Sequence, residues 1–198
     1  MLERLPLIIL AGSDSRRASV PSGMHAADML AGHKGALRLA DGKPLVGEVI
    51  DRFRQSGRFQ DPILVGPARI YEPLSLDCQV VDSEGALSTT LEDAVSVVTS
   101  RFDTHAPVAF TACDILPTAD ELSSLMADAY DPLANSVCWS QLVAARPDEM
   151  GASSWKPGYA FADSVRGAMN LYPGHLVVVR LAALRFEIMT RLLHLAYR

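Results

Sequence analysis

The chain has 198 residues, of which 49% are hydrophobic, 21% are charged and 7% are aromatic. This length provides one substantial core with at most a small appendage, and the composition excludes disorder and collagen-like order. The 18 basic and 23 acidic residues give a formal net charge of −5, which argues against general binding to nucleic acid. A small anionic ligand is compatible with this charge, because a local site can be positive on an acidic protein.

The three cysteines, Cys78, Cys113 and Cys138, are far apart and form no Cys-x-x-Cys pair. This pattern indicates neither a disulfide framework nor a zinc cluster, so we expect a reduced, cytoplasmic protein. No apolar run approaches the roughly 18 residues that a membrane-spanning helix needs, and no membrane partner is expected. The apolar run 5–10 contains Pro6 and follows an acidic residue, which favours a buried strand over a signal peptide.

The first part of the chain alternates apolar runs with one helical pattern. Leu5 to Leu10 is predicted to be a central parallel strand, because a strand covered on both faces is apolar throughout. The polar segment 13–33 is predicted to be a long loop, and long loops are usually functional lids or disordered. Two short strands are predicted at 62–66 and 78–81. A helix is predicted to begin at Pro44, after the loop and before these two strands. Its apolar residues recur at helical spacing, namely Leu45, Val46, Val49, Ile50 and Phe53.

The second part contains two capping boxes, in which a Thr precedes a Glu by three residues at the start of a helix. These are Thr89 with Glu92 and Thr118 with Glu121. Further strands are predicted at 107–113, 136–144 and 176–180, the last after a turn at Pro173-Gly174. A final amphipathic helix over 184–195 lacks the Gly or Pro that often follows a helix, which fits either a truncated chain or a frayed end.

Strands that alternate with helices at this spacing predict an α/β fold with a mostly parallel sheet. Ligands of such folds bind beyond the carboxyl ends of the strands. Three features fall at that edge: the loop after Leu10, the segment after Val81, and Asp114. The histidines His25 and His33 have no usual metal-ligand spacing and are expected to be solvated loop residues.

Leu10 to Arg17, followed at a distance by Lys34, is the first candidate constellation. A loop of small residues after a buried strand allows backbone N–H groups to approach a phosphate closely. Arg17 and Lys34 would then supply positive charge to a polyphosphate. The segment is neither a P-loop nor a Gly-x-Gly-x-x-Gly motif, and a simple turn with exposed arginines is the alternative.

Thr111 to Pro117 is the second constellation, with Asp114 directly after an apolar strand. A carboxylate there can hold Mg²⁺ while phosphates complete the coordination shell. The alternative is an aspartate that only caps the following turn. Lys43, just before Pro44, is open to two interpretations as well: a surface residue at the start of a helix, or a ligand contact.

These motifs together resemble the MobA-like NTP transferase family. The resemblance lies in Leu-Ala-Gly followed by Ser15-x-Arg17, then Lys34, then Gly-Lys-Pro-Leu at 42–45, then a strand ending Cys113-Asp114-x-x-Pro117. It implies a single three-layer α/β/α domain of the GT-A type with a Rossmann-like N-terminal half. Residues 5–130 would form the nucleotide-binding half, and residues 131–198 the acceptor side.

The resemblance also implies roles for individual residues. The nucleotide site would be lined by Leu10, Ala11, Gly12 and Ser13. Arg17 and Lys34 would face the triphosphate, and Asp114 would bind the metal. The segment from Asp82 to Leu87 would pass near the base, with Thr89 or Thr90 close to it. Gly174-His175-Leu176 would supply a second metal contact or an acceptor contact.

Three departures from the family pattern matter, and two further residues are added as candidates. Ser13 stands where a second glycine is usual, and 16 residues separate Arg17 from Lys34. His175 replaces an asparagine, so Asp163 becomes a rival metal ligand because Mg²⁺ prefers carboxylates. Lys156 is a further candidate cation on the acceptor side.

The predicted function is Mg²⁺-dependent nucleotidyl transfer from an NTP to a phosphorylated or hydroxyl small-molecule acceptor, with release of pyrophosphate. Kinship with molybdenum-cofactor enzymes favours GTP, and kinship with cytidylyltransferases favours CTP. The alternatives are a nucleotide-binding protein without catalysis and a sugar-nucleotide synthase on the same fold. The sequence leaves the acceptor and the oligomeric state open.

Overall fold

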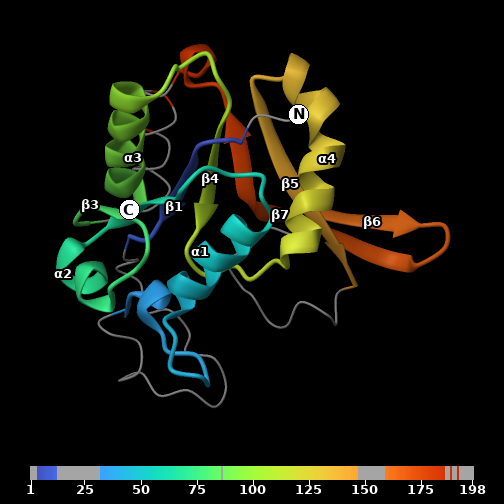
Figure 1. Ribbon diagram of the computed structural model, residues 1–198. Coiled ribbons are helices and arrows are strands. Elements are labelled where there is room, and N and C mark those ends of the chain that lie inside the picture. The colour runs from blue at the N-terminus through green and yellow to red at the C-terminus, as the bar shows by residue number, and fades with distance from the viewer. Residues whose placement is uncertain are drawn as a thin grey trace.

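The computed structural model describes residues 4–12, 32–85, 87–146, 159–185, 188 and 191. In this part of the chain the strands form one seven-stranded sheet with the path β3-β2-β1-β4-β7-β5, and β6 pairs with β7 (Figure 1). The strands are β1 (Leu7–Leu10), β2 (Ile63–Gly66), β3 (Gln79–Asp82), β4 (Val108–Ala112), β5 (Cys138–Ala145), β6 (Tyr159–Asp163) and β7 (Gly167–Val179). The α/β prediction is confirmed.

The first four strands are parallel, and the last three are antiparallel to their neighbours. Strand β1 pairs with β2 and β4, and β2 pairs with β3, all in parallel. Strand β7 runs antiparallel to β4, β5 and β6. Because parallel strands end at the same edge, the residues that follow β1 to β4 emerge side by side. Backbone bonds extend this pairing past the strands, from Ala11 N to Val65 O (2.8 Å) and from Cys113 N to Leu10 O (3.2 Å).

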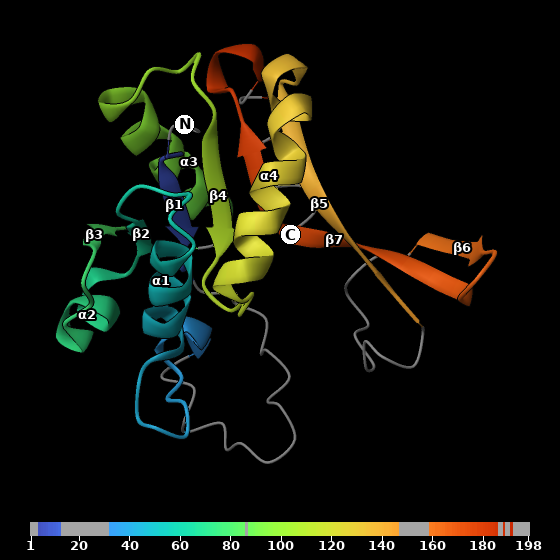
Figure 2. The same ribbon diagram turned by 45° about the vertical axis from the view of Figure 1, so that its right-hand side comes forward.

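Helices cover both faces of the sheet, as Figure 2 shows. They are α1 (Leu45–Gln55), α2 (Ala68–Tyr71), α3 (Leu87–Arg101) and α4 (Ala119–Asn135), with 3₁₀ turns η3 (Lys34–Ala36), η4 (Glu72–Leu74) and η5 (Leu181–Ala183). Leu7 and Ile9 pack with α1 and α4, whereas Ile8 packs with α3. This alternation along an apolar strand is what a sheet buried on both faces requires.

The two capping boxes have different outcomes. At α4 the box exists as predicted, because the Thr118 hydroxyl accepts the Glu121 N–H at 3.1 Å and the Glu121 carboxylate accepts the Thr118 N–H at 2.7 Å. The box at Thr89 is wrong, because α3 already begins at Leu87 and Thr89 lies within its first turn. The chain turns into this helix at Gly85, whose positive φ of 127° favours glycine.

The predicted turn at Pro173-Gly174 is also wrong, because β7 runs unbroken through both residues. Pro173 pairs with Leu142 of β5 where the register between the strands shifts, and proline is tolerated in a strand at such irregular positions. Glycine is needed beside it, since a Cβ on Gly174 would lie 2.6 Å from the Gln141 carbonyl oxygen. Strand β6 was not predicted, and with the first half of β7 it projects beyond the main sheet (Figure 2).

Two further sequence expectations concern helices. Most of the predicted final helix lies outside the described residues. Among the helices that the structure does describe, none has the length and apolar character to span a membrane.

Candidate functional site

The loop after β1 lies directly against the first turn of α3. A Cβ on Gly12 would stand 2.3 Å from the Thr90 Oγ1 atom, and Thr90 is fully buried. Only glycine leaves enough room for this approach at the carboxyl edge of the sheet. Leu10, Ala11, Gly12 and Thr90, all predicted to bind the nucleotide, are therefore neighbours in space.

Lys34 and Asp114 form an ion pair at the same edge. The Lys34 Nζ atom lies 3.1 Å from the Asp114 Oδ2 atom, and the two side chains are 37% and 25% exposed. Lys34 begins the 3₁₀ turn η3, and Asp114 follows β4 after one residue. Two residues 80 positions apart in the sequence, predicted separately as catalytic, are thus brought into contact with access to solvent.

A neutral, close-packed layer supports this pair. A Cβ on Gly35 would lie 3.1 Å from Tyr71 Oη and 3.2 Å from Cys113 Sγ. Burial, reinforced by the charge of Asp114, raises the pKa of the Cys113 thiol to about 12. Burial likewise raises the pKa of the Tyr71 phenol. Both groups stay protonated at neutral pH, so Cys113 is a packing residue here and not a thiolate nucleophile.

His33 is part of this layer, contrary to the expectation of a solvated histidine. Its side chain is only 2% exposed, and its ring meets Tyr71 edge-on, with centroids 6.2 Å apart. Burial, and then the charge of Arg69, lowers the pKa of His33, which Glu84 opposes. A neutral imidazole results at pH 7. Its Nδ1 atom has no hydrogen-bond partner among the residues that the structure describes.

The segment 82–87, predicted to pass near the base, begins with a contact that stabilises the fold. One carboxylate oxygen of Asp82 accepts the N–H of Ala68 at 2.8 Å and so caps α2. Ser83, the next residue, is buried, and its N–H donates to Gly66 O at 3.1 Å. Thr89 is half-buried and lies beside Gly85, so the described part of this segment borders the same edge of the sheet.

The two other predicted metal ligands lie in different places. Asp163 ends β6 and accepts the N–H groups of Val165 (2.8 Å) and Arg166 (2.7 Å), which lowers the pKa of its carboxyl. It therefore caps the turn of the β6–β7 hairpin, which projects away from the end of β4 that Asp114 follows (Figure 2). His175 lies on β7, beside the loop that follows Asp114.

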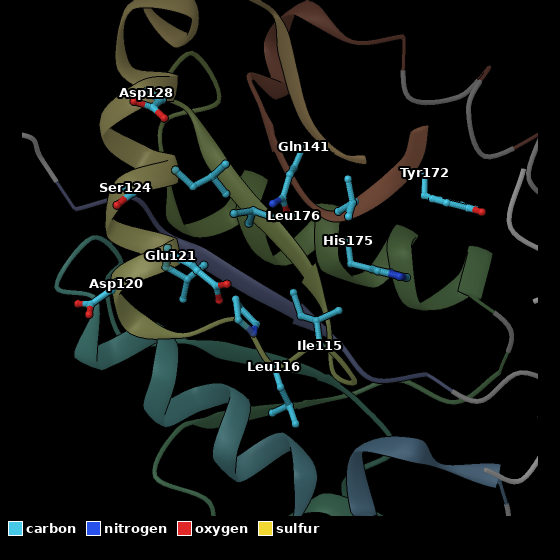
Figure 3. A pocket seen from close by; sticks show the side chains of 15 residues that line it. Ile115, Leu116, Asp120, Glu121, Ser124, Asp128, Gln141, Tyr172, His175 and Leu176 are labelled. Carbon is cyan, nitrogen blue, oxygen red and sulfur yellow. The ribbon is translucent and has the colours of Figure 1, made fainter. Parts of the chain in front are cut away.

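A groove of about 670 Å³ runs from this loop along α4 and over β5 and β7 (Figure 3). Ile115, Leu116 and Pro117 form the end of the groove that follows Asp114 in the chain. Glu121 of α4 extends into the groove, opposite Gln141 and His175 of the sheet. The sequence did not single out Gln141 or Tyr172 for this groove, because their place depends on the pairing of β5 with β7 and not on a local motif.

The sequence predicted a bound Mg²⁺ ion. No three His, Cys, Asp or Glu side chains gather in the described part of the chain, so no all-protein cage forms there. Magnesium is usually held by one or two carboxylates together with substrate phosphates. Asp114, half-buried at a strand end, fits a Mg²⁺ that arrives with a triphosphate. Ser13, Arg17 and Lys156 lie outside the described residues.

Comparison with known proteins identifies the family. Residues 7–185 match the MobA-like NTP transferase domain. The chain belongs to the MobA-like NTP transferase family. It is therefore a nucleotidyltransferase by family, as the sequence motifs predicted. A search of the curated proteins finds no match to this chain.

Solved structures share the fold at low sequence identity. A CMP:2-keto-3-deoxy-manno-octonic acid synthetase complexed with CTP has a TM-score of 0.63 at 13% identity, over 98% of this chain and 84% of that one. Rv0371c from Mycobacterium tuberculosis H37Rv has a TM-score of 0.54 at 17% identity, over 96% and 77%. The 4-diphosphocytidyl-2C-methyl-D-erythritol synthase of Anaerococcus prevotii has a TM-score of 0.51 at 9% identity, over 98% and 75%. The nucleotidyltransferase fold extends over nearly the whole chain.

Proposed function

We propose that this MobA-like NTP transferase moves a nucleotidyl group from an NTP to a small acceptor, with Mg²⁺, and releases pyrophosphate. The observation that carries the proposal is the Lys34–Asp114 pair of 3.1 Å at the carboxyl edge of β1 and β4. One cation and one carboxylate in contact at this edge, to which the Gly12 loop after β1 also leads, match the needs of a bound triphosphate.

The chemistry requires mainly positioning and neutralisation of charge, because the transferred phosphorus carries dispersed negative charge. Gly12 allows the backbone to approach the phosphates, and Lys34 stabilises charge on the departing pyrophosphate. Asp114 would hold the Mg²⁺, which supplies Lewis-acid stabilisation of phosphate oxygens when it is bound. Arg17 remains a predicted second cation for the triphosphate. In this scheme the Lys34 ammonium exchanges its contact with Asp114 for a contact with phosphate.

The groove beside Asp114 is the proposed acceptor site. Its apolar end at Ile115 and Leu116 directly follows Asp114 in the chain, so an acceptor bound there would lie next to the triphosphate. Gln141 and His175 offer hydrogen bonds to hydroxyl or phosphate groups of that acceptor. For the nucleotide we place CTP first, because two of the proteins that share the fold are a complex with CTP and a diphosphocytidyl synthase by name. GTP is the second choice, from the family resemblance.

A thermal-shift panel tests the proposal with CTP, GTP, ATP and UTP, each with and without Mg²⁺. A ligand at 100 times its dissociation constant stabilises the native state by about 2.7 kcal/mol, which raises Tm by roughly 5–10 °C for a chain of this size. We expect one nucleotide to do so only with Mg²⁺. Asp114→Asn should lose the shift, and Asp61→Asn, which changes a carboxylate 87% exposed on the surface, should keep it.

Pyrophosphate release in the presence of candidate acceptors then separates a transferase from a protein that only binds nucleotides. Turnover supports the proposal. Binding of an NTP without turnover on any phosphorylated or hydroxyl acceptor supports the binding protein instead, and the absence of any Mg²⁺-dependent shift contradicts both.

A further inference from the structure

The loop between Asp114 and α4 is held by a side chain from another helix. The Arg52 Nη1 atom donates to the carbonyl oxygen of Leu116 at 2.5 Å and approaches that of Pro117 at 3.4 Å. A hydrogen bond from a charged donor is about twice as strong as a neutral one. Arg52 of α1 thus fixes the backbone of the loop that begins at Asp114 and forms the end of the groove.

Glu48 sets the direction of the Arg52 guanidinium. Its Oε1 atom accepts the Arg52 Nε–H at 2.8 Å, one helical turn away on α1. Its other oxygen accepts from Lys43 Nζ at 2.6 Å. The hydrogen bonds from Lys43 and then Arg52 lower the pKa of Glu48. The carboxylate therefore stays ionised at neutral pH and holds the Arg52 Nε atom, while the Nη1 atom reaches the loop.

Lys43 is the lysine of the Gly-Lys-Pro-Leu motif, for which the sequence left two interpretations open. Its ammonium lies between two carboxylates of α1, those of Glu48 and of Asp51 at 2.5 Å. Those two hydrogen bonds raise the pKa of Lys43. The turn at Gly42, with φ of 84°, and the extended Pro44 place Lys43 directly before the helix. The Lys43 ammonium is therefore held by ion pairs with α1.

We propose that Arg52 is a positioning residue for Asp114 and for the end of the acceptor groove, and that Lys43 and Glu48 hold it in place. This inference rests on the proposed function, since it gives Asp114 the metal. The chain of contacts runs from Lys43 through Glu48 and Arg52 to the Leu116 and Pro117 carbonyls. Loss of Arg52 leaves both carbonyls without their charged donor and releases the loop that follows Asp114.

Hydrogen exchange and Mg²⁺ titration test the proposal in parallel on the full chain. In Arg52→Ala, we expect faster exchange at the amides of 114–116 and a roughly tenfold higher Mg²⁺ concentration for half of the nucleotide-dependent Tm shift. Arg52→Lys should recover only part of both effects, because an ammonium lacks the fork that joins Glu48 to the loop. Arg54→Ala is the matched control on the same helix, since Arg54 pairs with Asp61 and Asp77 instead.

Lys43→Met separates the two interpretations of the motif. If Lys43 belongs to the chain of contacts, Lys43→Met should raise the amide exchange rates at 114–116, as Arg52→Ala does, but by a smaller factor. If Lys43 is instead a phosphate ligand, Lys43→Met would weaken nucleotide binding and leave the amide exchange rates at 114–116 unchanged. That result would overturn this part of the proposal.

The two proposals fail in different ways. If Arg52→Ala matches Arg54→Ala in exchange at 114–116, the positioning role is wrong, whatever the nucleotide does. If exchange rises but the Mg²⁺ requirement does not, Arg52 does not act on Asp114 and the proposal is again wrong. If the unchanged protein shows no Mg²⁺-dependent nucleotide shift, the proposed function fails and the metal role of Asp114 fails with it.

Discussion

Gly12 and Thr90 approach each other so closely that the Cβ of an alanine at position 12 would lie 2.3 Å from the threonine hydroxyl oxygen. The contact joins the loop after β1 to the first turn of α3. Thr90 is fully buried there, so its side chain has no open space to move into. The glycine is thus a steric requirement of the site.

Gly12→Ala is expected to destabilise the protein by about 1–3 kcal/mol, the usual cost of overpacking a buried contact. It should also remove the Mg²⁺-dependent nucleotide shift, because the loop must move away from the helix. Urea denaturation and the thermal-shift panel measure the two effects. Thr90→Ala in the same chain removes the clashing oxygen and should recover most of the lost stability. An alanine variant as stable as the unchanged protein would contradict the contact.

Lys34→Met is expected to weaken nucleotide binding far more than it weakens the fold. A hydrogen bond between charged groups contributes about 1.5–3 kcal/mol, which corresponds to a loss of roughly 10- to 100-fold in affinity. A partly exposed ion pair contributes only about 0–1 kcal/mol to stability. Titration with the selected NTP and Mg²⁺, next to urea denaturation, separates these effects. Arg38→Met is the control, since Arg38 donates to the Gly42 carbonyl in an exposed turn. Equal affinity in both variants would exclude Lys34 from the triphosphate site.

His33 is expected to make stability fall as the pH drops below about 6.5. Its pKa in the folded state is lowered by burial, so below pH 6.5 the unfolded chain takes up the proton first and the folded state loses stability. For one group the slope stays below about 1.4 kcal/mol per pH unit. Urea denaturation at pH 5.0 to 8.0 should show this loss, and His33→Gln should reduce it. An unchanged slope in His33→Gln would argue against the burial.

Thr118→Ala is expected to cost about 1 kcal/mol of stability, the typical value for loss of an N-cap side chain. The hydroxyl accepts the Glu121 N–H at the start of α4, the helix that forms one wall of the groove. Thr99→Ala is a matched control, because the Thr99 hydroxyl bonds only to carbonyls of its own helix, those of Val95 and Ser96. Chemical denaturation of both variants measures the difference, and equal losses would exclude a special role of the cap.

The sequence predicted the parts of the fold that local patterns encode. The apolar runs predicted β1, β2 and β4, because strands covered on both faces are apolar throughout, and the shorter edge strand β3 was predicted around its two valines. Thr118 with Glu121 gave the start of α4, because the cap is a contact within four residues. Strand β6 was missed, since Tyr159 to Ala162 is apolar or small yet exposed on both faces and shows no alternation of apolar with polar residues.

The same distinction, between local patterns and contacts that join distant elements, applies to the residues of the candidate site. Asp114 was singled out because it directly follows an apolar strand, and Lys34 because the family resemblance includes a lysine; the fold brings the two into contact. The burial of His33 was missed, because it depends on Tyr71 from a distant helix. The roles of Arg52 and Gln141 also come from contacts between elements, and residue type alone does not reveal them.

The parallel pairing of β1 with β4 has a consequence for the order of folding. Leu7 pairs with Ala109, about a hundred residues later in the chain, so this pairing closes a large loop. Contacts of such high sequence separation form slowly, because the entropy of loop closure is lost before the pairing stabilises the chain. Lys34 can meet Asp114 only once that loop is closed. During synthesis the site is therefore assembled after β4 has joined the sheet, and earlier intermediates lack it.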